Sequence, residues 1–171
     1  MCPEGHLDWS TKKGTIMKNR LTLYIAVGMV LGVVAGYAVC NDLSEREFQL
    51  ERGGQWDKGK NCATFLPFGP WLATPEEIPD PQRLDLWLEV NGKRHQSSST
   101  ANMVFGVRFL VHYISQFMPL EAGDIISTGT PAGVGLGLKP PVYLKAGDSM
   151  RVGIHGLGEQ TQRVIDSPRD A

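Results

Sequence analysis

The longest apolar stretch of the chain runs from Leu21 to Cys40, where twenty successive residues carry no charge. Its length admits a membrane-spanning helix, because about 20 apolar residues cross the hydrocarbon core of a bilayer. Lys18 and Arg20 would supply the positive flank of such a helix. Its last part is β-branched and leads directly into Asn41 and Asp42. The pattern therefore predicts either a membrane anchor or a buried strand that delivers a carboxylate at its end.

A period-two alternation over Leu84–Val90 predicts a half-buried strand, since alternate side chains of a strand face opposite sides of the sheet. Asn91 and Gly92 follow, which is the strongest short signal for a two-residue hairpin turn, and Lys93–Gln96 is the expected return strand. Further short strands, separated by turns, are expected at residues 125–127, 142–144, 150–154 and 160–165.

A helical repeat follows Ser99 and Thr100, either of which can cap a helix. The spacing of its apolar residues predicts one continuous amphipathic α-helix from Met103 to Met118, with its apolar face in the core. Pro119 ends this helix. The apolar positions are Met103, Val107, Leu110, Val111, Ile114, Phe117 and Met118.

Polar residues are concentrated directly after the predicted buried strand. Asp42 stands at the strand end, and Ser44 is expected to cap a short helix, with Glu47 completing a capping box. Arg46 and Gln49 are three positions apart, so they share one face of that helix. The residues alone leave two interpretations open, a surface turn or a site that combines a carboxylate, a guanidinium and an amide.

Two later segments also carry candidate chemistry. Residues 50–62 form a polar loop that contains Lys58 and Lys60, and residues 64–72 form an aromatic, Pro-containing segment expected to line the core rather than stack on a substrate. The Gly-rich loop at 128–137 can form an anion-binding nest from successive backbone N–H groups. It lacks the Gly-Lys-Ser/Thr of a phosphate-binding P-loop.

Composition narrows the class of protein. The 171 residues are enough for one domain with a core, and 42% hydrophobic and 20% charged residues are typical of a soluble protein. Twenty glycines and 11 prolines favour a turn-rich β fold. A net charge of −1 gives no electrostatic case for nucleic-acid binding. Three cysteines without CxxC or zinc spacing fit reduced thiols, and we expect a cytoplasmic protein.

Three separated motifs resemble the fumarylacetoacetate hydrolase family, in its bacterial isomerase and ureidoglycolate lyase-like branch. They are Gly36–Gln49, Gly59-Lys60 and Thr128-Gly129-Thr130-Pro131-Ala132-Gly133-Val134-Gly135. The resemblance covers residue 34 to the C-terminus. It implies an α+β fold that is mainly β, a mixed β-sandwich roll with flanking helices, and commonly a homodimer. It also requires Val34–Cys40 as a core strand, which leaves about thirteen apolar residues, too few to span a membrane.

The resemblance also implies a site. Asp42 would bind a divalent metal, Mg²⁺ or Mn²⁺, and Lys60 and Thr130 would be catalytic. Arg46, Gln49, Thr128 and Gly129 would bind the substrate, a small 2-oxo acid or its enol form. The reaction would be hydrolysis, isomerisation or lyase chemistry through a metal-stabilised enolate. Asp42 would then lie at the floor of the largest polar cleft, facing Lys60 and the loop at 128–135.

The first 33 residues depart from the family and are expected to be a divergent segment before a domain at 34–171. Leu7-Asp8-Trp9 looks like the start of the family's Asp-Trp-Glu-x-Glu segment, whose two glutamates are metal ligands, but Ser10, Thr11, Lys12 and Lys13 follow here. This pattern suggests a truncated or frame-disrupted gene. Three functions are therefore weighed: a metal-dependent enzyme, a catalytically impaired fragment that lacks the two glutamates, and a membrane-anchored binding module using Leu21–Val33.

Overall fold

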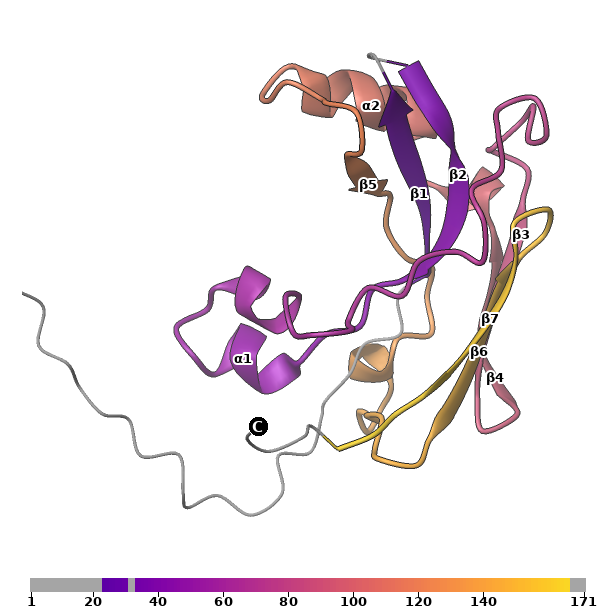
Figure 1. Ribbon diagram of the computed structural model, residues 1–171. Coiled ribbons are helices and arrows are strands. Elements are labelled where there is room, and N and C mark those ends of the chain that lie inside the picture. Colours follow the sequence, from indigo (N-terminus) through magenta and orange to yellow (C-terminus); the bar gives the residue numbers. More distant parts are fainter. Residues whose placement is uncertain (1–22, 31–32, 167–171) are drawn as a thin grey trace, which may run out of the picture.

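The computed structural model describes residues 23–30 and 33–166 of the chain, with side chains described from Val34 onward. The chain builds two sheets, and all their strand pairs are antiparallel (Figure 1). The first has three strands in the order β2-β1-β5 and the second four in the order β4-β3-β6-β7. The strands are β1 (Leu23–Val30), β2 (Val33–Asn41), β3 (Asp85–Val90), β4 (Lys93–Ser99), β5 (Ile125–Ser127), β6 (Ser149–Ile154) and β7 (Gly158–Arg163).

One core joins the two sheets. Tyr37 and Val39 of β2 are buried in a single apolar cluster with Leu88 of β3 and Val152 of β6. Burying such side chains contributes about 1.5–3 kcal/mol each, so this shared cluster is the main force that holds the sheets together. The expected mainly-β fold with short helices is confirmed.

The apolar stretch at the start of the described chain forms a strand pair. Residues Leu23–Val30, most of the segment weighed as a membrane anchor, are strand β1 and pair with β2 along their whole length. None of the helices in the described part of the chain is long and apolar enough to cross a membrane. The expected core strand at Val34–Cys40 is confirmed as part of β2.

The hairpin between β3 and β4 is confirmed. Val90 pairs with Lys93, so Asn91 and Gly92 are the two turn residues, with φ values of 50° and 77°. Both residues adopt positive φ, as a type I′ turn requires, which explains why Asn-Gly stands here. The expected strand at 142–144 is wrong, because these residues have no regular secondary structure, and the last strand begins at Gly158 instead of Gln160.

The expected helix from Met103 to Met118 is also wrong in extent. Helix α2 spans only Val107–Ser115, after a separate 3₁₀ turn, η2 (Thr100–Asn102), which Ser99 caps. The side-chain oxygen of Gln82 accepts from the backbone N–H of Val107 at 2.7 Å, and Met103 is extended. A cap from a distant residue therefore determines where the helix begins. The spacing of the apolar residues does not predict this cap.

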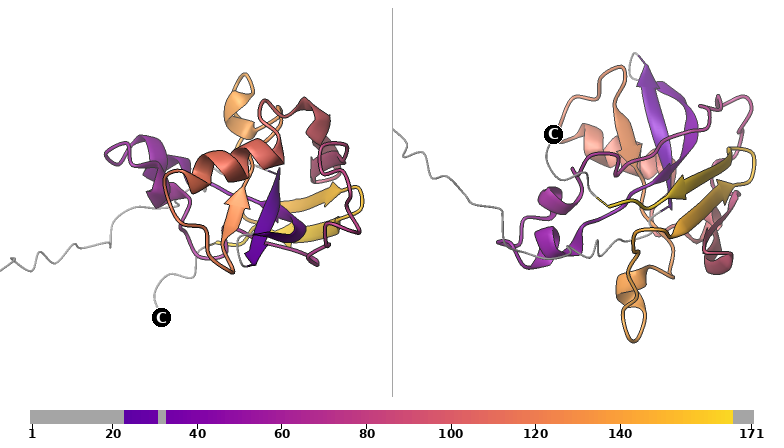
Figure 2. Two further views of the ribbon diagram at one scale, coloured as in Figure 1. Left: turned by 90° about the horizontal axis from the view of Figure 1, so that it is seen from above. Right: turned by 60° about the horizontal axis from the view of Figure 1, so that its bottom comes forward.

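Helix α2 lies beside β5 (Figures 1 and 2). Val107 is buried and Ile114 packs against the core. Phe117 and Met118, expected in the core, are 69% and 56% exposed. The other helical segments are α1 (Arg46–Leu50), η1 (Trp56–Gly59) and η3 (Gly135–Gly137).

Candidate functional site

The end of β2 is fixed by a chain of side-chain amides that crosses to the other sheet. Asn41 is fully buried, and its Nδ2 donates to Oε1 of Gln162 in β7 at 2.8 Å. Gln162 donates onward to Gln160, whose Nε2 donates to the carbonyls of Val39, at 2.8 Å, and Gly69. Since Asp42 directly follows Asn41, this network fixes the end of the strand from which Asp42 projects.

The helix after Asp42 is capped differently from the expectation. The carboxylate of Glu45, not the hydroxyl of Ser44, accepts from the backbone N–H of Glu47 at 3.0 Å. Ser44 is fully buried, and its Oγ has no hydrogen-bond partner among the described residues. A capping box that includes Ser44 is therefore wrong, because the helix begins one residue later, at Arg46.

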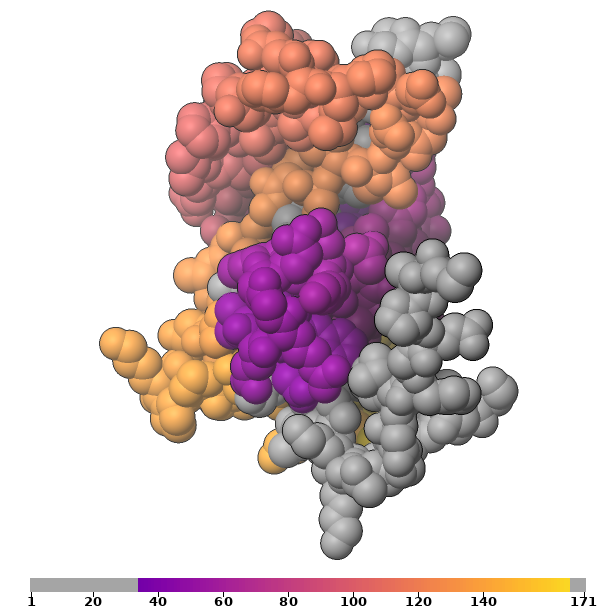
Figure 3. Space-filling view, turned by 90° about the vertical axis from the view of Figure 1, so that its left-hand side faces the viewer, coloured from indigo at the N-terminus to yellow at the C-terminus, as the bar shows by residue number. Residues whose placement is uncertain are grey.

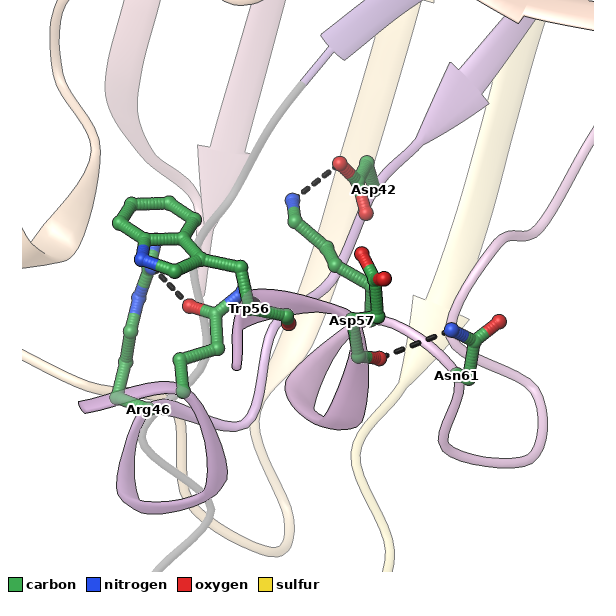
Figure 4. Close-up of polar contacts among 7 residues, drawn as sticks. Asp42, Arg46, Trp56, Asp57 and Asn61 are labelled. Carbon is green, nitrogen blue, oxygen red and sulfur yellow. Dashed lines mark hydrogen bonds and ion pairs between the residues drawn. The ribbon is translucent and has the colours of Figure 1, made fainter. Parts of the chain in front are cut away.

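Arg46 and Gln49 share one face of α1, as their spacing predicts, and are hydrogen-bonded to each other. Both are buried, and the Arg46 guanidinium lies 5.7 Å from the ring centroid of Trp56 in η1, within range of a cation–π contact. Figure 4 shows Arg46 beside Trp56 rather than beside Asp42. The two predicted substrate-binding residues therefore hold α1 against η1 in this structure.

The packing of α1 on η1 depends on Gly59. A Cβ atom at this position would overlap the backbone oxygen of Glu45 and the side chain of Gln49. The backbone N–H of Glu45 also donates to the Gly59 carbonyl at 2.8 Å. Figure 3 shows this α1–η1 unit in the middle of one face of the molecule. Glycine therefore allows the close approach that places the next residue, Lys60.

Lys60 reaches Asp42 across the space between η1 and the end of β2. Its Nζ forms an ion pair with Oδ2 of Asp42 (Figure 4), and the side chains are 25% and 11% exposed. Lys58, the other lysine of the loop, instead donates to the carbonyl of Arg52 at 3.0 Å on the surface. The structure thus places Lys60, not Lys58, beside the carboxylate.

The pair lies in the wall of a cleft of about 510 Å³. Phe65 lines the cleft, and its carbonyl accepts a hydrogen bond from the backbone N–H of Leu43 at 3.0 Å. The hollow over β3 and β4, which includes Trp87, is larger at about 650 Å³, so the expectation that Asp42 lies in the largest cleft is wrong. The lining residues are Asp42, Lys60, Asn61, Cys62, Thr64, Phe65, Leu66 and Ser127.

The Gly-rich loop begins at the edge of this cleft. Ser127 lines it, and Thr128 and Gly129 follow directly along the chain. Thr130 does not line the cleft: its Oγ1 accepts from Nε2 of Gln96 in β4 at 2.9 Å. A Cβ atom at Gly133 would overlap the backbone oxygen of His95, so the loop lies directly on β4.

Two thiols near the pair are held in the neutral form. Burial raises the pKa of Cys40 to about 12, and the negative charge of Asp42 adds to this, partly offset by Ser127 and Lys60. Burial, followed by the charge of Glu45, raises the pKa of Cys62 in the cleft wall. Neither thiol is activated as a nucleophile, since the thiolate is the reactive form.

The described residues do not fit a divalent metal ion on their own. Mg²⁺ needs near-octahedral oxygen ligands, and Asp42 is the one carboxylate that lines the cleft in the described part of the chain. Its partner is the positive charge of Lys60. Residues 23–30 and 33–166 contain no group of three His, Cys, Asp or Glu that could hold a metal. The segment at 8–13, where the resemblance places the other ligands, lies outside the described residues.

The sequence predicted that Asp42 and Lys60 lie together, but it did not predict most of the other residues that line the cleft. Asn61 and Cys62 follow Lys60, and Ser127 precedes the Gly-rich loop, so proximity in sequence was an available signal. Gln160 and Gln162 were also missed. They occupy alternate positions on the less exposed face of β7, where a strand normally carries apolar residues, and two amides there were the sign of a buried polar network.

The sequence of this chain is similar to sequences of known proteins over almost its whole length. A family model described as fumarylacetoacetate (FAA) hydrolase C-terminal matches residues 7–165. A protein of Burkholderia cenocepacia (strain HI2424) named "Putative hydrolase" is 55% identical over 168 residues, which are 96% of this chain and 59% of that protein.

Two solved structures share the fold over most of the described chain. A fumarylacetoacetate hydrolase from Exiguobacterium antarcticum is 36% identical with a TM-score of 0.83, over 90% of this chain and 58% of that one. A 2-hydroxyhepta-2,4-diene-1,7-dioate isomerase from Mycobacterium marinum is 34% identical with a TM-score of 0.76, over 88% and 60%. The chain therefore spans about three fifths of the length of the relatives it matches.

Proposed function

This chain belongs to the fumarylacetoacetate hydrolase family, and on that basis we propose that its cleft binds 2-oxo acids or their enol forms. The reaction class is that of the family's hydrolases and isomerases, with lyase chemistry as a variant. The observation that carries the proposal is the Lys60–Asp42 pair in the wall of a cleft that is also lined by Ser127, the residue before the Thr128–Thr130 loop.

Lys60 provides the chemistry that an enolate needs. An ammonium group has three N–H donors, and Asp42 takes one of them, so donors remain for a substrate oxygen. Positive charge fixed at the oxygen where negative charge develops stabilises that charge during enolisation. Backbone N–H groups at Thr128 and Gly129, which directly follow the cleft-lining Ser127, would hold the substrate carboxylate.

Metal ions are expected at this site from the family resemblance. The family resemblance implies Mg²⁺ or Mn²⁺, with Asp42 as one ligand. The described residues bring one carboxylate and one lysine to this place, which do not make a divalent-metal site by themselves. We propose instead that the chain binds these ions weakly and turns over its substrate slowly, as expected for a catalytically impaired member of the family.

The proposed function also includes an oligomeric state and a cellular location. We propose a homodimer in the cytoplasm, with a small-molecule substrate and no nucleic acid. The net charge of −1 supports the last point. Light scattering coupled to size-exclusion chromatography measures the mass in solution, and a mass of one chain, 18.8 kDa, would refute the homodimer.

Calorimetric titration with oxalate, a mimic of the 2-oxo acid enolate, tests the binding site. We expect saturable binding to the wild-type chain and at least tenfold weaker binding to Lys60→Ala. Lys58→Ala is the matched control, since that lysine lies on the surface of the same loop and does not line the cleft, and it should bind as the wild type does. Equal affinity in the wild type and Lys60→Ala, or no binding to the wild type, would overturn the proposal.

A further inference from the structure

Thr64, in the wall of the cleft that contains the Lys60–Asp42 pair, has a strained backbone. Its φ is 66°, in the left-handed region. A β-branched residue rarely adopts this conformation, because its Cβ atom lies too close to the carbonyl oxygen that follows it. Asn91 is the other non-glycine residue with positive φ in the part of the chain that the structure describes, and the hairpin turn accounts for it. The strain at Thr64 needs a different explanation.

The turn that contains Thr64 does not require a threonine. The backbone N–H of Phe65 donates to the carbonyl of Cys62 at 3.2 Å, which makes Thr64 the third residue of a four-residue turn. Glycine is the preferred residue at this position when φ is positive. A glycine would also allow Phe65, which is 6% exposed, to enter the core as it does now. The formation of the turn therefore leaves the side chain of Thr64 unexplained.

The side chain of Thr64 is accessible to a ligand in the cleft. Thr64 is exposed, whereas the next residue, Phe65, is buried. Asn61 and Ser127 line the same cleft, so its wall combines the ammonium group of Lys60 with one amide and two hydroxyl groups. A hydroxyl group can donate one hydrogen bond, and a bond to a charged oxygen is about twice as strong as a bond between neutral groups. These polar groups suit the oxygen atoms of an anionic ligand.

From these observations we infer that Thr64 is a substrate-contacting residue, whose hydroxyl donates a hydrogen bond to an oxygen of the 2-oxo acid group. Residues in strained conformations cluster at active sites and ligand clamps, where the surrounding structure holds them in place. A strained threonine in the wall of this cleft fits that pattern. The inference rests on the proposed function, since it adds a residue to the same site.

Calorimetric titration of oxalate into variants of the full chain tests this role. Thr64→Val keeps the branched side chain but removes the hydroxyl, so we expect at least tenfold weaker binding. Thr64→Gly removes the whole side chain and should weaken binding equally. Thr64→Ser keeps the hydroxyl and should bind within threefold of the wild type. Asn91→Gly is the matched control, because it removes a side chain at the other position of positive φ, which does not line the cleft, and it should bind as the wild type does.

Urea unfolding of Thr64→Gly provides a second measurement. Relief of the strain should offset the greater freedom of glycine in the unfolded chain, so we expect a midpoint equal to or above that of the wild type. Binding that weakens while stability is kept indicates a side chain that serves the ligand. A residue that serves only the turn would show no loss of binding.

The outcomes separate this inference from the proposed function. If oxalate binds in a Lys60-dependent way and Thr64→Val or Thr64→Gly binds it as tightly as the wild type, Thr64 does not contact the ligand and the site stands. Equal losses in Thr64→Ser and Thr64→Val would exclude the hydroxyl, and an equal loss in Asn91→Gly would exclude a local effect. A lower urea midpoint in Thr64→Gly would overturn the argument from strain. If oxalate does not bind to the wild type, the proposed function itself fails.

Discussion

The Nζ atom of Lys60 forms an ion pair with the carboxylate of Asp42, across eighteen positions of sequence. Neither residue is on a regular element: Asp42 follows β2 directly, and Lys60 follows the last residue of η1. The pair therefore depends on how the α1–η1 unit packs against the end of β2, and the predictions below test that dependence.

Removing the lysine should destabilise the fold as well as weaken binding. Lys60→Ala leaves a carboxylate whose side chain is 11% exposed without its cation. Breaking a buried ion pair lowers the unfolding free energy by about 3–5 kcal/mol, and breaking an exposed ion pair lowers it by about 0–1 kcal/mol. Because solvent partly screens the charge of Lys60, we expect a loss of about 1–3 kcal/mol here. Urea unfolding measures the change. Lys58→Ala should stay within about 0.5 kcal/mol of the wild type, and an equal loss in both variants would contradict the account.

Gly59 should tolerate no side chain. Gly59→Ala places a methyl group against the Glu45 carbonyl and the Gln49 side chain, which are packed on it, so we expect a loss of about 1–3 kcal/mol in unfolding free energy. Oxalate binding should fall with it, because the position of Lys60 shifts. Gly137→Ala is the control, since its Cβ would lie 3.6 Å from Val134, an ordinary contact. A fully stable Gly59→Ala variant would contradict the packing described.

Gln162 should hold the end of β2 from the opposite sheet. Gln162→Ala removes the 2.8 Å acceptor of the buried Asn41 amide, and we expect a loss of about 1 kcal/mol, the net contribution of one hydrogen bond. Thr161→Ala, at the next and exposed position of β7, should change stability by less than about 0.5 kcal/mol. Thermal and urea unfolding compare the two variants. Similar stability in both variants would show that the amide network does not stabilise the contact between the two sheets.

The stability of the protein should fall at alkaline pH through Cys40. Its folded pKa of about 12 lies above the ordinary value of 9.0, so above pH 9 the unfolded chain loses this proton while the folded chain keeps it. Linkage then lowers the unfolding free energy by about 1.4 kcal/mol per pH unit between pH 9 and 12. Cys40→Ala should show a shallower decline than the wild type. Parallel declines from pH 8 to 11 would contradict the shift.

The sequence predicted those parts of the fold and site in which local chemistry and tertiary packing agree. The strand ending at Asn41, the Asn91-Gly92 turn and the Arg46–Gln49 spacing each follow from a short pattern, and the structure has all three. Lys60 was selected over Lys58 by the family motif, and the structure places it beside Asp42.

The errors arose where a distant residue decides the local structure. Gln82 caps α2 from outside the helical repeat, so the repeat overestimated the helix. Glu45 displaced Ser44 as the cap of α1. The aromatic, Pro-containing composition of residues 64–72 predicts core lining, and Phe65 does enter the core. Leu66 is exposed and lines the cleft, because local composition cannot distinguish the wall of a cleft from the interior.

A crystal structure of the chain with oxalate tests the central claim most directly, namely that Lys60 and the cleft around it bind the 2-oxo acid group. We predict an oxalate oxygen about 2.7–3.2 Å from Nζ of Lys60, in the cleft between Ser127 and Phe65, and no oxalate there in crystals of Lys60→Ala. Oxalate bound only elsewhere, or a cleft without oxalate at ten times the calorimetric dissociation constant, would contradict the account.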